Sequence, residues 1–167
     1  MRRTLTALSP LLALAIAGCA MSPKLESYRP KDADETAIVS TLRKIPYGIN
    51  AKALDVLLQP YAEDVYVGNF YKYLGAAGPT APLSISRADL RGVYTDLFRA
   101  TKGISLDVKD FRLSVTGERA VAFARTELLL TQEGGRREEK ERLFVNDVTW
   151  RLRRTAAGWK IVEEIWQ

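Results

Sequence analysis

The sequence contains no histidine and a single cysteine, Cys19. Histidine is the commonest general base near neutral pH and the commonest metal ligand, so its absence removes the simplest routes to both functions. A lone cysteine forms no disulfide within the chain. If it is lipidated, no thiol remains as a nucleophile or a metal ligand. We therefore expect no metal and no cofactor.

The sequence also has no segment in which charge of one sign is concentrated. The 167 residues include 25 basic and 20 acidic side chains, with a formal net charge of +5. This excess is too small and too evenly scattered to indicate nucleic-acid binding. With 47% hydrophobic and 27% charged residues, the composition is that of one ordinary globular domain with a short additional segment.

The first residues have the architecture of a bacterial export signal. Arg2 and Arg3 precede an apolar run over residues 11–17 that is short for a membrane span. Residues 16–19 (Ile-Ala-Gly-Cys) resemble the lipobox of bacterial lipoproteins. The resemblance implies cleavage before Cys19, followed by diacylglyceryl and N-acyl modification of that cysteine. The alternative is an ordinary signal peptide with a chance cysteine.

The chain is thus divided into a lipoprotein signal peptide over residues 1–18, a lipidated cysteine and tether over residues 19–31, and a domain over residues 32–167. Residues 20–31 show neither helical nor strand periodicity and contain two prolines, so we expect a flexible tether reaching roughly 20 Å. Ala20 occupies the position where an aspartate favours inner-membrane retention in such lipoproteins. The resemblance therefore implies a lipid anchor in the cell envelope, at the periplasmic face of the outer membrane.

Three helices are predicted in the first part of the domain, each with apolar residues at helical spacing. The first begins at a cap, Asp32, and we expect Pro46 to end it. Asn50 is the candidate cap of the second helix. The third runs from a cap at Ser86 to Gly103, where a left-handed C-cap is expected.

From residue 104 onward the apolar residues alternate, which predicts long strands. A slip of phase between Val108 and Phe111 indicates a β-bulge, and a further short strand is predicted over residues 62–67. The predicted turns lie at Gly117-Glu118, Gly134-Gly135 and Ala157-Gly158. We predict an α+β, cone-shaped fold with three N-terminal helices packed on a strongly bent antiparallel sheet.

Several short motifs resemble the nuclear transport factor 2-like superfamily, which includes SnoaL-type cyclases, ketosteroid isomerase and scytalone dehydratase. Residues 57–65 (Leu-Leu-Gln-Pro-Tyr-Ala-Glu-Asp-Val) resemble its helix-to-first-strand signature, and residues 117–122 (Gly-Glu-Arg-Ala-Val-Ala) resemble its Gly-Asp-x-Ala turn. Residues 148–152 and 158–162 resemble its paired last strands. The resemblance covers residues 34–166 and implies the cone-shaped fold.

The catalytic residues of that superfamily do not carry over intact. The isomerase places an aspartate just after the first strand, where residues 67–69 here read Val-Gly-Asn. Ile45 falls nearest the isomerase's helical tyrosine, and the dehydratase's histidines have no counterpart. The resemblance therefore favours a non-catalytic domain. The alternative is an isomerase-, dehydratase- or cyclase-type enzyme with Glu163 or Glu127 as carboxylate base.

The candidate ligand-binding residues are polar or aromatic: Tyr66, Tyr94, Arg125, Glu127, Asn146, Trp150 and Glu163. Arg125 and Glu127 share one strand face, which either lines a pocket or carries a solvated ion pair. Asn146 shares an apolar face with Trp150, where it either lines a cavity or satisfies a neighbouring backbone group. Glu163 is either a buried carboxylate near the cone mouth or an exposed charge.

These observations predict a membrane-anchored envelope lipoprotein whose pocket-bearing domain binds a small apolar ligand or a protein partner. The expected partners are the membrane, through the lipid anchor, and a small apolar ligand or envelope protein. Family members often dimerise through the outer face of the sheet, so the resemblance also implies a possible homodimer.

Overall fold

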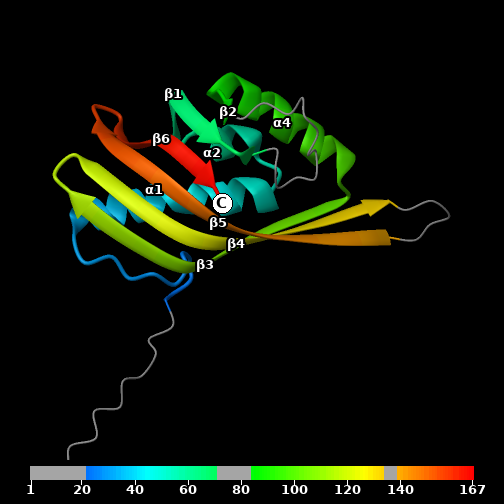
Figure 1. Ribbon diagram of the computed structural model, residues 1–167, viewed down its shortest axis with the longest axis horizontal. Helices are drawn as coiled ribbons and strands as arrows, with labels where there is room; N and C mark the ends of the chain where they lie inside the picture. Colours follow the sequence, from blue (N-terminus) through cyan, green and yellow to red (C-terminus); the bar gives the residue numbers. More distant parts are fainter. Residues whose placement is uncertain (1–21, 71–83, 134–138) are drawn as a thin grey trace, which may run out of the picture.

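The computed structural model describes residues 22–70, 84–133 and 139–167 (Figure 1). The predicted signal peptide, Cys19 and the turn at Gly134-Gly135 lie outside these residues. The elements follow in the order α1 (Ala33–Asn50), α2 (Leu54–Leu58), β1 (Tyr61–Gly68), β2 (Ser84–Ile85), α4 (Arg87–Ala100), β3 (Gly103–Thr116), β4 (Arg119–Glu133), β5 (Glu139–Thr155) and β6 (Gly158–Trp166). None of the helices in these ranges combines the length and hydropathy that crossing a bilayer requires.

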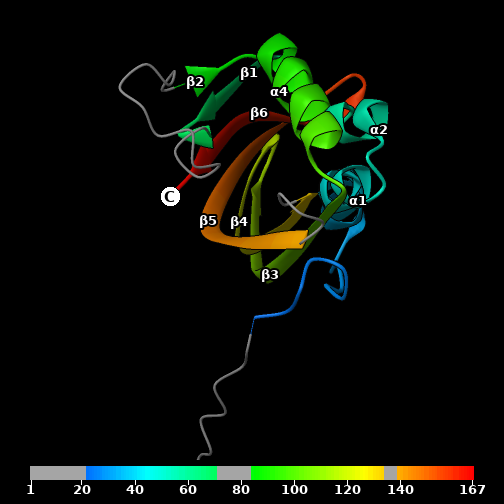
Figure 2. The ribbon, with the colours of Figure 1, turned by 90° about the vertical axis from the view of Figure 1, so that its right-hand side faces the viewer.

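The strands form one six-stranded sheet in the order β2-β1-β6-β5-β4-β3. The sheet bends strongly around the helices, as Figure 2 shows from the side. The predicted α+β, cone-shaped fold with helices on a bent sheet is confirmed. Every pairing is antiparallel except that of β1 with β6, which is parallel. The chain reaches β6 last, after the meander β3-β4-β5, and this long return permits the parallel pairing.

The strand pairings contain three register shifts: one in the β1–β6 pair between Tyr61 and Tyr66, and two β-bulges that shape the rest of the sheet. The first bulge interrupts the pairing of β3 with β4 between Lys109 and Arg112, where Asp110 has a φ of 51°. It confirms the bulge predicted from the slip of phase in the sequence. The second lies in β6, where Ile161 pairs with Leu152 but Glu163 already pairs with Arg151. One extra residue in β6 therefore reverses which side chains face the helices beyond that point.

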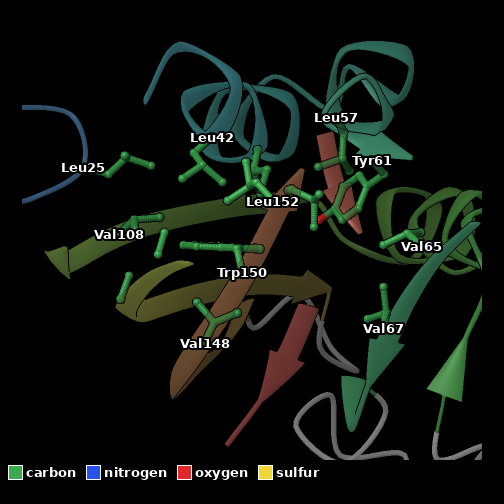
Figure 3. Packing of buried hydrophobic residues seen from close by; sticks show 14 of the residues in the cluster. Leu25, Leu42, Leu57, Tyr61, Val65, Val67, Val108, Val148, Trp150 and Leu152 are labelled. Atoms are coloured by element: carbon green, nitrogen blue, oxygen red, sulfur yellow. The ribbon is translucent and has the colours of Figure 1, made fainter. Parts of the chain in front are cut away.

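The core fills the space between α1, α2 and the concave face of the sheet (Figure 3). Trp150 and Leu152 of β5 are almost fully buried there, close to Leu42 of α1 and Leu57 of α2. Small side chains on the paired strand β4 leave room for the large ring, since Ala122 is the direct partner of Trp150. Alternating large and small residues on neighbouring strands is how a curved sheet fills its concave side without voids.

The helices differ from the sequence prediction at their ends. Pro46 lies inside α1, which continues to Asn50, so the expectation that Pro46 ends the helix is wrong. The apolar face of α1 continues through buried Ile49, and this packing outweighs the hydrogen bond that proline removes. Asn50 caps no helix. Its amide instead bonds the backbone of Leu106 on β3, accepting from the N–H at 2.6 Å and donating to the carbonyl at 3.3 Å.

The start of α4 follows the prediction, and its end does not. Ser86 and Asp89 form a reciprocal capping box, with the Ser86 hydroxyl accepting from the Asp89 N–H and the Asp89 carboxylate accepting from the Ser86 N–H. The C-cap, however, is Thr101, and Gly103 is the first residue of β3 rather than a left-handed cap.

The segment over residues 23–28 is not a free tether. Its Leu25 is 1% exposed and belongs to the hydrophobic core. The Leu25 N–H donates to the Val108 carbonyl at 3.0 Å, and the Pro23 carbonyl accepts from the Phe111 N–H at 2.8 Å. We call residues 23–28 the strap. The expected tether over residues 19–31 is thus corrected: the strap belongs to the folded domain because it satisfies the outer edge of β3 and buries a leucine.

We expect Leu25→Ala to destabilise the soluble protein beginning at residue 20 by about 2–4 kcal/mol, the usual effect of removing a buried leucine side chain. Urea unfolding followed by tryptophan fluorescence measures this change. Ser27→Ala, on the exposed side of the strap, is the control and should change stability by less than about 0.5 kcal/mol. Equal stabilities of the two variants would mean that the strap is detached in solution.

Candidate functional site

A carboxylate is buried where β1, β5 and β6 meet. The Glu164 side chain is fully inaccessible to solvent. Its Oε2 accepts from the Tyr61 hydroxyl at 2.7 Å and from the Trp150 indole N–H at 2.8 Å. Its Oε1 accepts from the Trp166 indole N–H at 2.7 Å. Three donors from three strands therefore converge on one carboxyl group.

Burial raises the pKa of the Glu164 carboxyl above its ordinary value of 4.5, because removal from water disfavours the charged form. The three hydrogen bonds oppose this by stabilising the carboxylate. The protonated form also fits the site, because it could donate to the Tyr61 oxygen while both indoles still donate to the carboxyl oxygens. Burial, together with the nearby Glu164 charge, raises the pKa of Tyr61 and Tyr94 well above the ordinary tyrosine value.

A small apolar pocket adjoins this group, with Trp166 shared between them. The lining residues are Ile49, Phe70, Tyr94, Leu97, Leu106, Leu128, Phe144, Asn146 and Trp166. Phe70 stacks edge-on against both Tyr94, at a centroid distance of 5.5 Å, and Trp166, at 5.8 Å. The cavity volume of the pocket is about 20 Å³, and the empty space between its lining atoms, partly open to solvent, is about 390 Å³. A cavity of this volume is the size of a site for one water molecule.

Two polar groups face this apolar lining. Tyr94, 3% exposed, and the side-chain amide of Asn146 have no hydrogen-bond partner among the residues that the structure describes. The backbone of Asn146 is held in place by the Thr126 hydroxyl, which donates to its carbonyl at 3.0 Å. A phenol hydroxyl and an amide can each donate and accept a hydrogen bond, so a ligand with one polar group could be oriented here.

A wider groove lies outside the cone, between the strap, the C-terminal half of α1 and β3. Its volume is about 510 Å³. Three of the polar side chains that line it are engaged: Arg43 donates to strap carbonyls, Asn50 bonds the backbone of Leu106, and Asp107 pairs with Lys24.

The structure brings three of the predicted ligand-binding residues to the concave side. Tyr94 and Asn146 line the pocket. Trp150 is buried in the core, where its indole N–H donates to the Glu164 carboxyl. The face of β5 that carries Asn146, Val148 and Trp150 is the inner one, as the pattern of apolar residues predicted.

The other four predicted residues lie elsewhere. Arg125 and Glu127 are on the convex face, where Arg125 pairs with Asp147 at 3.0 Å and Glu127 with Lys109 at 2.6 Å. The pocket interpretation of this pair is wrong, because the alternating alanines of β4 take the inner face instead. Tyr66 is 47% exposed and does not line the pocket.

Glu163 is also outside the pocket and pairs with Arg151 at 2.9 Å. Of the two alternatives for Glu163, the structure therefore shows the exposed charge, because the bulge in β6 turns its side chain away from the face of Trp159 and Ile161. The buried carboxylate is therefore the neighbouring Glu164, which the sequence analysis missed together with its partners Tyr61 and Trp166. The sequence holds one hint, two successive glutamates between apolar residues, but it does not say which of them faces inward.

Within the described residues, no three acidic side chains gather into a group that could hold a metal ion. Among the described residues, the polar groups at or beside the pocket include Glu164 with its donors, Tyr94 and Asn146. This set can orient a small molecule through hydrogen bonds. None of the described residues that line the pocket is a carboxylate.

Comparison with solved structures places this arrangement in a well-populated fold. A protein from Kribbella flavida matches with a TM-score of 0.68 and 15% identity, over 80% of this chain and 89% of that one. An NTF2-like protein with a cystatin-like fold from Novosphingobium aromaticivorans matches with a TM-score of 0.59 and 17% identity, over 80% of each chain. A ketosteroid isomerase-like protein from Erwinia carotovora matches with a TM-score of 0.56 and 16% identity, over 78% of this chain and 92% of that one. At these identities the likeness shows the fold.

The bent sheet and its helices have the fold of these NTF2-like structures. The model of the SnoaL-like domain matches residues 66–164, so the chain belongs to the SnoaL-like domain family. A search of curated proteins found no match to this sequence. The family includes isomerases, dehydratases and ligand-binding proteins, so membership alone does not choose among these functions.

We expect Glu164→Gln to destabilise the domain by about 3 kcal/mol, because an amide has one acceptor where the carboxyl has two. Whichever way the amide is turned, one indole N–H faces an NH₂ group and loses its partner. Urea unfolding of the soluble domain measures the loss. Glu163→Gln is the matched control, one residue away in the chain, and should cost less than about 1 kcal/mol because its ion pair with Arg151 is partly exposed.

The same pair of proteins tests the charge state of Glu164. A raised folded-state pKa favours folding below the unfolded value of 4.5 and loses this contribution as the pH rises through the folded value. The stability difference between wild type and Glu164→Gln should therefore be largest in acid and decrease as the pH rises above 4.5. A difference that increases over this range would show that the carboxylate, and not the acid, is the form the fold prefers.

Proposed function

We propose that this protein is a lipid-anchored envelope protein whose cone binds a small, neutral and mostly apolar molecule without transforming it. One observation carries the proposal: the pocket is lined by apolar side chains with just two polar groups, Tyr94 and Asn146, and neither has a hydrogen-bond partner within the described residues. Apolar walls with a few placed polar groups are the usual composition of a small-molecule site.

The size of the pocket limits what it can hold. With a cavity volume of about 20 Å³, a ligand larger than water must displace part of the aromatic wall. Phe70 packs against both Tyr94 and Trp166. The Trp166 ring is fixed by the hydrogen bond from its indole N–H to Glu164. A single ring with one carbonyl or hydroxyl group fits these limits.

The enzymatic alternative has weaker support. Glu163 and Glu127 are engaged in ion pairs outside the pocket, so Glu164 would have to be the base. Its raised pKa favours that role. However, Glu164 does not line the pocket, and both of its oxygens already accept hydrogen bonds. A base must reach the proton that it removes, and this geometry favours binding over catalysis.

The membrane anchor and the homodimer are further parts of the proposal. The lipobox-like residues 16–19 support lipidation of Cys19 and a position at the periplasmic face of the outer membrane. The homodimer is supported by exposed apolar residues on the sheet: Val121, Leu143 and Val145. An envelope protein could occupy the same surface.

We expect cyclohexanone, a neutral ring with one carbonyl, to bind in the millimolar range and to shift the NMR signals of the Asn146 amide and the Trp166 indole. Tyr94→Phe removes one hydrogen-bond donor and should weaken this binding about 3- to 10-fold, the equivalent of roughly 1 kcal/mol. Tyr66→Phe, an identical change at an exposed tyrosine outside the pocket, should leave the affinity unchanged. Equal effects of the two substitutions, or no shifts at saturating concentrations, would contradict the pocket assignment.

We expect the mature protein from bacterial membranes to lack residues 1–18 and to carry a diacylglyceryl group and an amide-linked acyl chain on Cys19. Intact-mass spectrometry measures both changes. Cys19→Ser should abolish the mass gain and release the protein from the membrane fraction, because the thioether bond needs the thiolate sulfur. Ser22→Ala, three residues away, is the control. A membrane-bound, lipid-free protein would contradict the anchor.

A further inference from the structure

The strap is fastened to the outer edge of β3, the last strand of the sheet. The Pro23 carbonyl accepts from the Phe111 N–H at 2.8 Å and the Leu25 N–H donates to the Val108 carbonyl at 3.0 Å. These bonds span the β3 bulge, where the strand turns its backbone groups away from β4. The Lys24 ammonium adds an ion pair to Asp107 at 2.7 Å. The strap is therefore held by the backbone on both sides of the bulge.

Arg43 of α1 holds the strap from the other side. Its guanidinium donates to the carbonyls of Leu25, Glu26 and Tyr28, at 3.2, 2.8 and 3.0 Å. Tyr28 in turn donates to Glu35 at 3.0 Å and packs edge-on against Phe111 at 5.0 Å. Since the Leu25 side chain is buried beneath these contacts, releasing the strap would expose a core residue and break a group of charge-assisted bonds.

The chain between the proposed anchor and the strap is short. Four residue steps separate Cys19 from Pro23, and even a fully extended chain covers about 14 Å over that number of steps. If Cys19 carries lipid, Pro23 and the β3 bulge beside it must therefore remain within about 14 Å of the bilayer surface. A free tether of a dozen residues would allow the domain to take any orientation.

We infer that the edge formed by the strap and the β3 bulge is the membrane-facing surface of this protein, and that the strap fixes the orientation of the domain on a lipid bilayer. The inference rests on the proposed lipid anchor. Figures 1 and 2 both show α4 on the side of the domain opposite the point where the chain leaves toward its N-terminus. The α4 helix would then face away from the bilayer.

The charges near this edge are balanced. Lys24 pairs with Asp107, Lys109 with Glu127, and Arg125 with Asp147. A surface without net basic charge gains little from anionic lipids. The orientation should therefore depend on the length of chain between the anchor and the strap, and not on the lipid headgroup.

Energy transfer on vesicles tests this orientation. The full-length lipidated protein is reconstituted in phosphatidylcholine vesicles that carry a fluorescent acceptor on a small fraction of headgroups. A donor dye is placed on a single introduced cysteine, either Ser114→Cys on β3 or Gly92→Cys on α4. Ser114 is exposed, and a Cβ at Gly92 meets no other atom within 4 Å, so both labels should leave the fold intact. Unfolding curves and circular dichroism check this for each labelled protein.

We expect transfer from position 114 to exceed that from position 92 about twofold, because a domain of this size spans roughly 35–40 Å. Inserting 20 flexible Gly and Ser residues between Met21 and Ser22 should remove this difference while the protein stays bound. The same result is expected in vesicles with added phosphatidylglycerol. Equal transfer from the two positions, or a difference that survives the insertion, would overturn the fixed orientation while leaving the anchor standing. Failure of the protein to float with vesicles would overturn the anchor and the orientation together.

Discussion

Burial of the Glu164 carboxyl is the constraint on which the arrangement of this domain depends. Removing a carboxyl group from water costs several kcal/mol unless its oxygens are hydrogen-bonded. Here the donors come from three strands: Tyr61 on β1, Trp150 on β5 and Trp166 on β6. The two outer strands of this group, β1 and β5, both flank β6. The network therefore specifies how the parallel β1–β6 pair joins the antiparallel meander, because any other register leaves buried donors unpaired.

The same carboxyl connects the core to the pocket. By accepting the Trp166 indole N–H it fixes the ring that forms part of the pocket wall. Burial, together with the nearby Glu164 charge, raises the pKa of Tyr94. A group buried for structural reasons thus sets the shape and the hydrogen-bonding character of the ligand site. At the β3 edge of the sheet, the strap occupies backbone groups that would otherwise be open to pairing with another strand.

The sequence predicted those features that depend on local pattern. The Ser86 capping box, the bulge between Val108 and Phe111 and the inner face of β5 with Asn146 follow from residue types within a few positions of one another. The features that it missed depend on distant contacts. Pro46 is tolerated in α1 because the helix continues to bury apolar residues, and the strap docks because β3 and Arg43 provide partners. Neither partner is adjacent in the chain, so no periodicity reveals them.

The bulge in β6 shows why the candidate base was misplaced by one residue. A strand alternates its side chains between two faces, and one inserted residue exchanges the faces for everything that follows. Glu163 and Glu164 are chemically identical, so the position of the insertion alone decides which becomes an exposed ion-pair partner and which a buried acid. Their environments then make them different: Glu163 interacts with one arginine, whereas Glu164 is held by three neutral donors in the core. A carboxyl so completely engaged is suited to fixing the geometry of a binding site. One of its two oxygens accepts from the indole of Trp166, the ring that also forms part of the pocket wall.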